Sequence, residues 1–321
     1  MTSISSSTFQ LTTPQDRTLH GILDLPADQP QPWPVVVICH GFKGFMEWGF
    51  FPHLAHLLAE RGFATVRFNF SGAGQMPGDE KVTDLAAFRD NTYSRELEDL
   101  LAVLDALSED GDLHDERFDM DRLGLFGHSR GGGAALLAAA HRDWADQVSA
   151  LVTWAAIAYV DRFPQEAKEM WHIRGTSSIT NSRTGQELPL GLGLLEDIDT
   201  NRLKLDLEAA AGRREAPWLL VHGTDDESVP KSEADRLAAA ATGDHEVLYI
   251  DGAGHTFGAT HPWNGPTPHL TEAMNATQSW FRECLTGEGR KVEDETSDEP
   301  ASGDDSGDGG DDAAKADDDE K

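Results

Sequence analysis

The sequence predicts an α/β fold with a mostly parallel central sheet that is covered by helices on both faces. Three observations support this prediction. Short, continuous apolar runs, which are typical of strands buried on both faces, alternate with longer segments of helical periodicity. Glycine-containing turns follow several of these runs, which is where open α/β sheets place their ligands. The 321-residue chain is also 39% hydrophobic, enough for one large core.

The predicted strands come from apolar runs that end at turns. Residues 7–11 and 17–25, separated by a Pro-Gln-Asp turn, are expected to open the chain as an antiparallel hairpin. The run VVVIC at residues 35–39 shows no polar alternation, so it predicts a strand buried on both faces. The other expected strands are residues 64–70, 122–126, 150–154, 218–221 and 246–250.

The predicted helices come from apolar residues spaced three or four positions apart. Residues 50–61 have this spacing and end at Gly62, a residue that readily adopts the left-handed conformation that terminates helices. In residues 94–107, leucines line one helical face. The other expected helices are residues 130–142, 231–241 and 270–285.

Residues 159–213 interrupt the alternation of strands and helices. The segment is longer than a strand-to-strand crossover needs and contains a Ser/Thr/Asn-rich turn at residues 176–184. Long segments over sites often carry function, so we expect a cap insertion within a domain of residues 1–285. The alternative is a peripheral insert that does not contact substrate.

The charge is strongly acidic: 57 Asp and Glu against 26 Lys and Arg, a formal net charge of −31. Residues 286–321 hold 15 acidic and 4 basic residues and almost nothing apolar, which predicts a disordered acidic tail. Such acidity disfavours binding to nucleic acid and to anionic membranes. Because the acidity extends beyond the tail, we favour adaptation to high salt over a tail that docks a basic partner.

No run of about 18 apolar residues predicts a transmembrane helix, and the first ten residues lack the basic start and apolar run of a secretory signal. The two cysteines, Cys39 and Cys284, form neither a disulfide framework nor a metal cluster. These features predict a cytoplasmic protein. They give no indication of its oligomeric state.

The motif GHSRG at residues 127–131 matches the pattern G-x-S-x-G. It follows an apolar strand and opens a helix, the context in which a serine on a tight, strained turn becomes an exposed nucleophile. The glycines are needed because side chains two positions on either side would clash. Ser129 is therefore the candidate nucleophile. The alternative is a glycine-rich turn that holds a phosphate or merely packs.

The motif HGFKG at residues 40–44 follows the strand at residues 35–39. Acyl transfer needs preorganised donors for the developing oxyanion. One is expected from the backbone N–H of Arg130, directly after the nucleophile, and the other from the loop after this earlier strand, at Phe42.

A serine nucleophile also needs a base, and the base needs a carboxylate to orient it. Asp226 is the expected carboxylate because of its spacing from the His-Gly pair at the end of its strand, and Asp225 is the alternative. His255, in a loop of small residues after the last strand, is the expected base. His261 and His269 are the alternatives.

The chain order Ser129, Asp226, His255 is that of α/β-hydrolases. Over residues 8–285 the sequence resembles this superfamily, and within it the dienelactone hydrolase-like esterases, cinnamoyl esterases and acylaminoacyl-peptidase-like domains. The segments HGFKGF at residues 40–45 and RFNFSG at 67–72 fit that group. The resemblance implies hydrolysis of carboxylic esters through an acyl-enzyme, without a cofactor. One departure is that dienelactone hydrolases proper use a cysteine nucleophile.

The expected partner is therefore a small-molecule ester. We expect substrate contacts from aromatic and other side chains near the motifs, although each could instead belong to the core. Positive charge from Lys43 and the Arg130 side chain near the nucleophile would favour acidic or polar esters. The alternative is that both are solvated surface side chains. A serine peptidase or an acyltransferase could use the same catalytic residues. A non-catalytic binding protein is the alternative from another functional class. No cluster has metal-ligand spacing. The candidate substrate residues are Lys43, Phe45, Trp48, Met76, Trp171 and Trp263.

Overall fold

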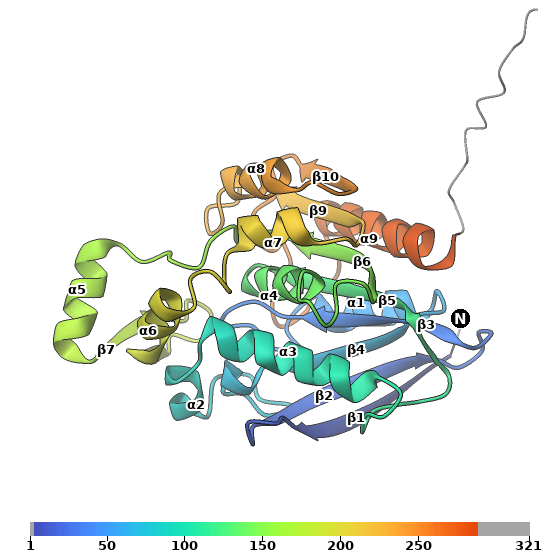
Figure 1. Cartoon of the computed structure of the whole chain (residues 1–321), viewed down its shortest axis with the longest axis horizontal. Coiled ribbons are helices and arrows are strands. Elements are labelled where there is room, and N and C mark those ends of the chain that lie inside the picture. The colour runs from blue at the N-terminus through green and yellow to red at the C-terminus, as the bar shows by residue number, and fades with distance from the viewer. Residues whose placement is uncertain (1–2, 288–321) are drawn as a thin grey trace, which may run out of the picture. The chain divides into compact units, whose positions relative to one another are not determined.

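The computed structural model describes residues 3–287, which form an eight-stranded sheet and its covering helices (Figure 1). The strand order is β1-β2-β4-β3-β5-β6-β9-β10. In this sheet β2 pairs antiparallel with β1 and with β4, and all other neighbouring strands pair parallel. This arrangement confirms the predicted α/β fold. The strands are β1 Ile4–Thr12, β2 Thr18–Pro26, β3 Trp33–Cys39, β4 Ala64–Asn69, β5 Phe118–His128, β6 Val148–Trp154, β9 Trp218–Gly223 and β10 His245–Ile250.

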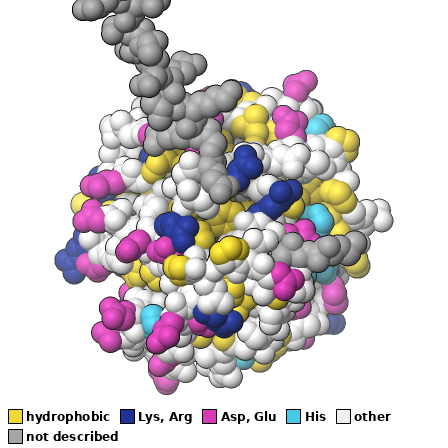
Figure 2. Space-filling view, turned by 90° about the vertical axis from the view of Figure 1, so that its right-hand side faces the viewer, with side chains coloured by type: hydrophobic (Ala, Val, Ile, Leu, Met, Phe, Trp, Pro, Cys, Tyr) yellow, Lys and Arg dark blue, Asp and Glu magenta, His cyan; other side chains and the backbone are white. Residues whose placement is uncertain are grey.

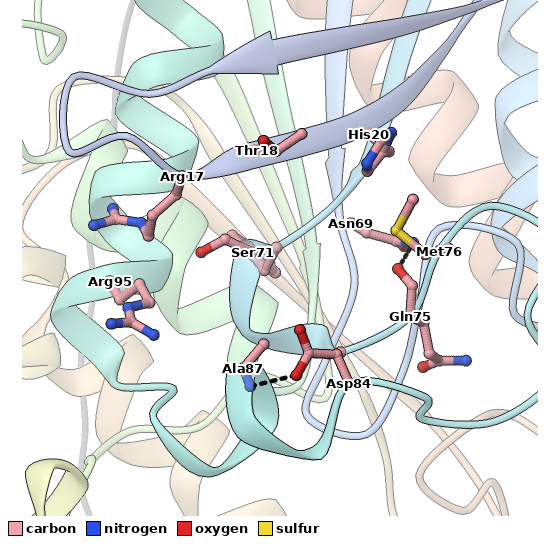
Figure 3. A pocket seen from close by; sticks show the side chains of 12 residues that line it. Arg17, Thr18, His20, Asn69, Ser71, Gln75, Met76, Asp84, Ala87 and Arg95 are labelled. Carbon is pink, nitrogen blue, oxygen red and sulfur yellow. Dashed lines mark hydrogen bonds between the residues drawn. The ribbon is translucent and has the colours of Figure 1, made fainter.

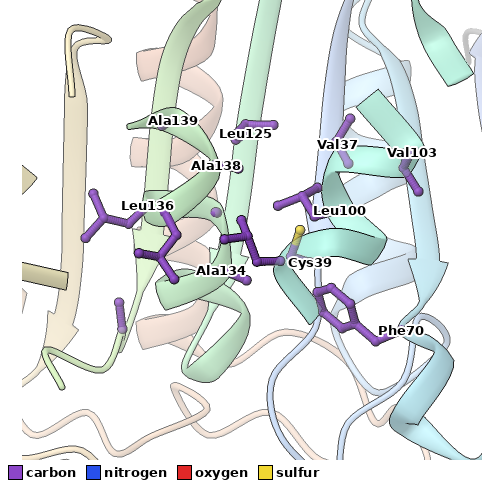
Figure 4. Packing of buried hydrophobic residues seen from close by; sticks show 14 of the residues in the cluster. Val37, Cys39, Phe70, Leu100, Val103, Leu125, Ala134, Leu136, Ala138 and Ala139 are labelled. Atoms are coloured by element: carbon purple, nitrogen blue, oxygen red, sulfur yellow. The ribbon is translucent and has the colours of Figure 1, made fainter. Parts of the chain in front are cut away.

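Two helical layers cover the sheet, because successive side chains of a buried strand point to opposite faces. In β3, Val35, Val37 and Cys39 pack into one core, whereas Val36 and Ile38 pack into the other. Figure 4 shows the first core, where β3 and β5 meet the helices α3 and α4. The first layer contains α3 Tyr93–Leu107, α4 Arg130–Ala139, α7 Leu207–Arg213 and α8 Lys231–Ala240, and the second contains α1 Phe51–Ala59 and α9 Pro268–Thr286.

Residues 159–213 lie between β6 and β9, and their first part, up to about residue 200, extends to the left in Figure 1, whereas α7 lies in the first helical layer. The predicted turn at residues 176–184 is in part wrong, because Thr176–Thr180 is strand β7, paired antiparallel with β8 Glu187–Gly191. Its alternating Ser, Thr and Ile residues suit a half-exposed hairpin. Gln186 fixes the hairpin turn through hydrogen bonds to the backbone N–H and carbonyl of Val82. The segment also contains α5 Gln165–Arg174 and α6 Gly193–Thr200, and ends with α7.

The loop between β4 and α3 contains two further short elements that were not predicted, the 3-10 helix η1 at Ser71–Ala73 and helix α2 at Leu85–Arg89. Both lie close to the start of β2. The side chain of Asp84 caps α2 by accepting hydrogen bonds from the backbone N–H groups of Ala86 and Ala87. This loop therefore has a defined structure although it lacks a long periodic pattern.

The predicted acidic tail, residues 286–321, lies outside the described residues except for Thr286 and Gly287. Figure 2 shows one face of the molecule, on which Asp and Glu side chains are spread out with Lys and Arg side chains between them. Within residues 3–287, no helix is long and apolar enough to cross a membrane, and no group of three His, Cys, Asp or Glu side chains could hold a metal ion.

Candidate active site

Ser129 stands between the end of β5 and the first residue of α4. Its backbone is in the left-handed region, with φ 56°, an unfavourable conformation for a residue with a side chain. The flanking glycines make the turn possible. A Cβ on Gly127 would lie 2.3 Å from the carbonyl oxygen of Gly131, and a Cβ on Gly131 would lie 2.3 Å from that of His40. The motif thus folds as the tight turn that the sequence predicts.

The turn at residues 41–44 lies against this serine. A Cβ on Gly41 would be 3.0 Å from the Cβ of Ser129, and the Gly44 N–H closes the turn on the Gly41 carbonyl at 3.0 Å. The residue before the turn is anchored, because His40 Nε2 accepts a hydrogen bond from the Phe70 N–H at 3.2 Å. The turn therefore presents residues 42 and 43 beside the candidate nucleophile.

Asp226 and His255 lie together, as expected. His255 Nδ1 donates to Asp226 Oδ2 at 2.8 Å, while Asp226 Oδ1 accepts from the N–H groups of Ser228 and Val229 at 2.8 and 2.9 Å. Asp226 is only 6% exposed. Burial alone would raise its pKa, but the hydrogen bond and charge of His255 and the two backbone donors hold the pKa of Asp226 below its ordinary value. It is therefore ionised and can stabilise a protonated His255.

The alternatives to these two residues lie elsewhere. Asp225 is exposed. His261 accepts a hydrogen bond from the Gly49 N–H at 3.0 Å, and its Nε2 lies 2.7 Å from Glu80 Oε2. His269, at the start of α9, does not line a cavity that contains Ser129. The geometry favours Asp226 and His255.

His128, directly before the serine, contacts the loop that carries His255, and it was not predicted from the sequence as a site residue. Its Nε2 donates to the backbone carbonyl of His255 at 2.8 Å. Burial, and then the charge of His255, lowers the pKa of His128 to about 3, so it is neutral. The available signal was a histidine at the variable position before the nucleophile, at the end of a buried strand.

Two cavities open at Ser129, and His255, Phe42 and Lys43 line both. The smaller cavity has a volume of about 220 Å³ and the larger about 450 Å³. The insertion at residues 159–213 contributes to each. It supplies Asn181, Ser182 and Arg183 to the smaller cavity, and Arg162, Phe163 and Ile179 to the larger.

Of the candidate substrate residues, Lys43 and Trp48 line these cavities. The structure does not bring the other four to them. Phe45 packs on His261 with ring centroids 5.0 Å apart, Trp263 packs on His53 at 5.0 Å, and Trp171 is buried against Phe163 at 5.2 Å.

Met76 lines a separate cavity of about 340 Å³ between β2 and the loop at residues 69–76 (Figure 3). This cavity also contains Arg17, which is bound to Glu98 and Asp99. Ser129 is not among its lining residues.

Comparison with known proteins identifies the family of the chain. The model of the prolyl oligopeptidase family matches residues 48–288, which include Ser129, Asp226 and His255 but not the turn at residues 41–44. The Bacillus subtilis (strain 168) protein YitV, provisionally named an esterase, is 26% identical over 197 residues, 61% of this chain and 70% of its own length. An uncharacterised 31.7 kDa protein of Escherichia coli, from the traX-finO intergenic region, is 31% identical over 107 residues. That match spans 33% of this chain and only 32% of the relative.

Solved structures share the fold. Est1E from Butyrivibrio proteoclasticus has a TM-score of 0.62 at 20% identity, covering 87% of this chain and 99% of its own. A dienelactone hydrolase from Anabaena variabilis has a TM-score of 0.58 at 19% identity, covering 88% and 99%. These likenesses confirm the α/β-hydrolase fold that the sequence resemblance implied.

Proposed function

Since the chain belongs to the prolyl oligopeptidase family, we propose that it is a serine esterase that cleaves small or medium-sized carboxylic esters through an acyl-enzyme. The observation that carries the proposal is the surroundings of Ser129. Its strained turn opens into two cavities shared with His255, and the buried Asp226 holds that histidine. The name of the Bacillus subtilis relative supports ester hydrolysis.

The proposed reaction starts with proton transfer from the Ser129 hydroxyl to Nε2 of His255. The Nδ1–H of His255 remains hydrogen-bonded to Asp226 throughout. The Ser129 oxygen attacks the ester carbonyl, and the backbone N–H groups of Phe42 and Arg130 stabilise the oxyanion. His255 then protonates the departing alcohol. Water, activated by the same histidine, attacks the acyl-enzyme and releases the acid and free Ser129.

The family is named for peptidases, so a serine peptidase on the same residues is the second candidate. The lining of the two cavities favours the esterase over a peptidase that recognises a free N-terminus. Among residues 3–287, no Asp or Glu side chain lines either cavity, so neither offers a carboxylate to the ammonium group of a peptide N-terminus. An acyltransferase would differ only in the acceptor that takes the acyl group from Ser129.

We also propose that residues 159–213 act as the cap. Their contribution to both cavities supports this role, as does their attachment to the main domain. In α6, Asp197 Oδ2 accepts a hydrogen bond from the Ser94 N–H at the start of α3, at 3.0 Å. The domain boundaries, residues 1–285, and the cytoplasmic location remain predictions from the sequence.

The test compares wild type with Ser129→Ala on p-nitrophenyl acetate and butyrate, together with labelling by a fluorophosphonate probe. We expect hydrolysis and labelling by wild type, and neither by the variant. Ser149→Ala, which removes a hydroxyl at the far end of β6, should keep both. A wild type that neither hydrolyses nor labels contradicts the proposal. Cleavage of a dipeptidyl p-nitroanilide in preference to the esters would support the peptidase.

A further inference from the structure

The side chain of Arg130 is buried beside the candidate nucleophile, at 5% exposure, and most of its hydrogen-bonding capacity is unused. A guanidinium has five N–H donors. Nε donates to Glu96 Oε2 at 2.6 Å, but the buried Nη2 has no partner among the described residues. The group lies over the rings of Tyr93 and Phe42, 3.8 and 5.2 Å from their centroids. A buried donor without an acceptor is costly. Because Nη2 is enclosed by protein, the group open to a ligand is Nη1, which also has no hydrogen-bond partner among the described residues.

Arg130 lines the larger cavity at Ser129, and the charge of that cavity is opposite to the charge of the chain. Within the described part of the chain, its lining includes Lys43, Arg130 and Arg162 but no Asp or Glu, although the chain has 57 acidic and 26 basic residues. The compensating carboxylates lie outside the lining: Glu96 behind Arg130, and Glu233 behind Arg162 at 2.5 Å.

Lys43 is not compensated in this way. Within residues 3–287 it forms no ion pair, and its half-buried position lowers the pKa of its ammonium group below the ordinary value. The Lys43 ammonium and Nη1 of Arg130 are therefore two cationic donors at one cavity that have no acceptor among the described residues. Arg183 in the smaller cavity differs, because it is already bound to Glu80.

Six of the remaining wall residues of the larger cavity are aromatic or aliphatic, and the others are Ser129, Ser228 and His255. Its volume of about 450 Å³ is twice that of the smaller cavity. An occupant with an apolar stem and an anionic end fits such a lining, because the stem fills the apolar part and the anion meets the donors. The apolar wall residues are Phe42, Tyr93, Ile157, Phe163, Ile179 and Val229.

We propose that this cavity binds a carboxylate carried by the ester substrate, through Arg130 and Lys43. The substrate class is then an ester with an aliphatic carboxylate on one side of the scissile bond, such as a half-ester of a dicarboxylic acid. This inference rests on the esterase function proposed above. It adds a requirement for charge that ester hydrolysis alone does not impose.

The test uses matched pairs of esters that differ by a terminal carboxylate in place of a methyl group. Monoethyl adipate and ethyl hexanoate place the difference on the acyl side, and 6-acetoxyhexanoate and hexyl acetate place it on the alcohol side. The measured quantity is the ratio of kcat/KM within each pair, at fixed ionic strength. We expect the carboxylate to be preferred by wild type in one pair, roughly tenfold. That pair identifies which side of the ester occupies the cavity.

Variants assign the preference to the named residues. Arg130→Met and Lys43→Met should each lower the ratio, roughly tenfold and threefold, whatever they do to overall activity. Glu96→Gln should raise it, because the charge of Arg130 is then uncompensated. Arg142→Met removes an equally charged but exposed guanidinium at the end of α4 and should leave the ratio unchanged. An equal preference for both members of each pair, or a ratio that follows Arg142 as much as Arg130, overturns the inference.

Binding of the uncleaved esters keeps this test separate from the esterase proposal. Calorimetric titration of Ser129→Ala with both members of each ester pair needs no turnover. Tighter binding of the carboxylate ester in one pair, lost in the Ser129→Ala/Arg130→Met double variant, supports the carboxylate site even if no ester is cleaved. Ester hydrolysis by wild type without tighter binding of a carboxylate ester or a charge preference overturns the site and leaves the esterase intact. If the guanidinium only stacks on rings and binds a buried water, the two members of each pair bind equally.

Discussion

The imidazole of His128 lies against that of His255, with ring centroids 4.7 Å apart, and its Nε2 is 2.8 Å from the backbone carbonyl of His255. A carbonyl only accepts hydrogen bonds, so Nε2 of His128 carries the proton. The contact joins the end of β5, which carries Ser129, to the loop after β10, which carries the proposed base. We therefore expect His128 to act as a positioning residue for His255.

Replacing His128 with phenylalanine keeps the ring volume but removes the donor to the His255 carbonyl. We expect kcat for p-nitrophenyl butyrate to fall by about 10- to 100-fold with little change in KM, because small displacements of a catalytic group are costly. The exposed His114 provides the matched control, and His114→Phe should keep wild-type kcat. An unchanged kcat in a folded but less stable His128→Phe variant would reduce this histidine to a structural role.

Asp226→Asn and Asp225→Asn separate the two adjacent aspartates. Asparagine at position 226 keeps the shape but favours the wrong tautomer of His255, so we expect kcat to fall by about 10³- to 10⁴-fold. The exposed Asp225 should tolerate the same change within a few-fold. Steady-state kinetics on one ester decides between them, and a larger loss at position 225 would move the proposed acid to Asp225.

Gly131→Ala should destabilise the fold, since the new Cβ would lie 2.3 Å from a backbone oxygen, which has little room to move. We expect the free energy of unfolding to fall by about 2–3 kcal/mol, as for overpacked cores. Gly193, at the start of α6, serves as the control, because a Cβ added there would have no neighbouring atom within 4 Å. Urea unfolding of Gly131→Ala and Gly193→Ala measures the difference, and equal stabilities would contradict the close approach described here.

Three buried histidines should make the fold sensitive to mild acid. Burial lowers the pKa of His40 to about 4 and that of His128 to about 3, and it lowers the pKa of His222 below its ordinary value. In the unfolded chain these groups titrate near pH 6.5, so below that pH the unfolded state binds more protons than the native state. Their stabilisation is complete above about pH 6.5 and declines as the pH falls toward 4.

Urea unfolding at pH 7.5, 6 and 5 measures this decline. The variant His40→Gln, which has no titrating group at that position, should show a shallower loss of stability over the same range. A variant whose pH dependence matches that of wild type would show that His40 does not contribute.

The net charge of −31 predicts that salt stabilises the fold by screening self-repulsion. We expect the midpoint of thermal unfolding to rise between 0.1 and 2 M KCl, and ester hydrolysis to increase with it. Sucrose at matched osmolality is the control for effects other than ionic screening. A midpoint that is insensitive to KCl would argue against adaptation to high salt.

Much of the sheet could be predicted from local pattern. The run at residues 35–39 has no polar alternation because both of its faces are buried, and it coincides with β3. The Ser129 turn was recognisable because only glycines fit at positions 127 and 131, so the two glycines mark the turn in the sequence. Chain order then limited the choice of carboxylate and base.

The cavity lining could not be predicted in the same way. A tryptophan or phenylalanine has the same local signature in a core as in a cavity wall, so Trp171 and Trp48 look alike until the packing of distant segments is known. The hairpin of β7 and β8 was hidden for a related reason. Its Ser- and Thr-rich strands form no continuous apolar run, and contacts with residues 80–82 fix its turn.

The proposed reacting groups and part of the walls around them come from different segments of the chain. Ser129, Asp226 and His255 sit where strands of the sheet end, whereas one excursion, residues 159–213, supplies different side chains to each of the two cavities. The chemistry and the choice of substrate can therefore evolve separately. In directed evolution, residues 159–213 are the segment to exchange or randomise. The cavity lining can then change while the sheet holds the proposed reacting groups in place.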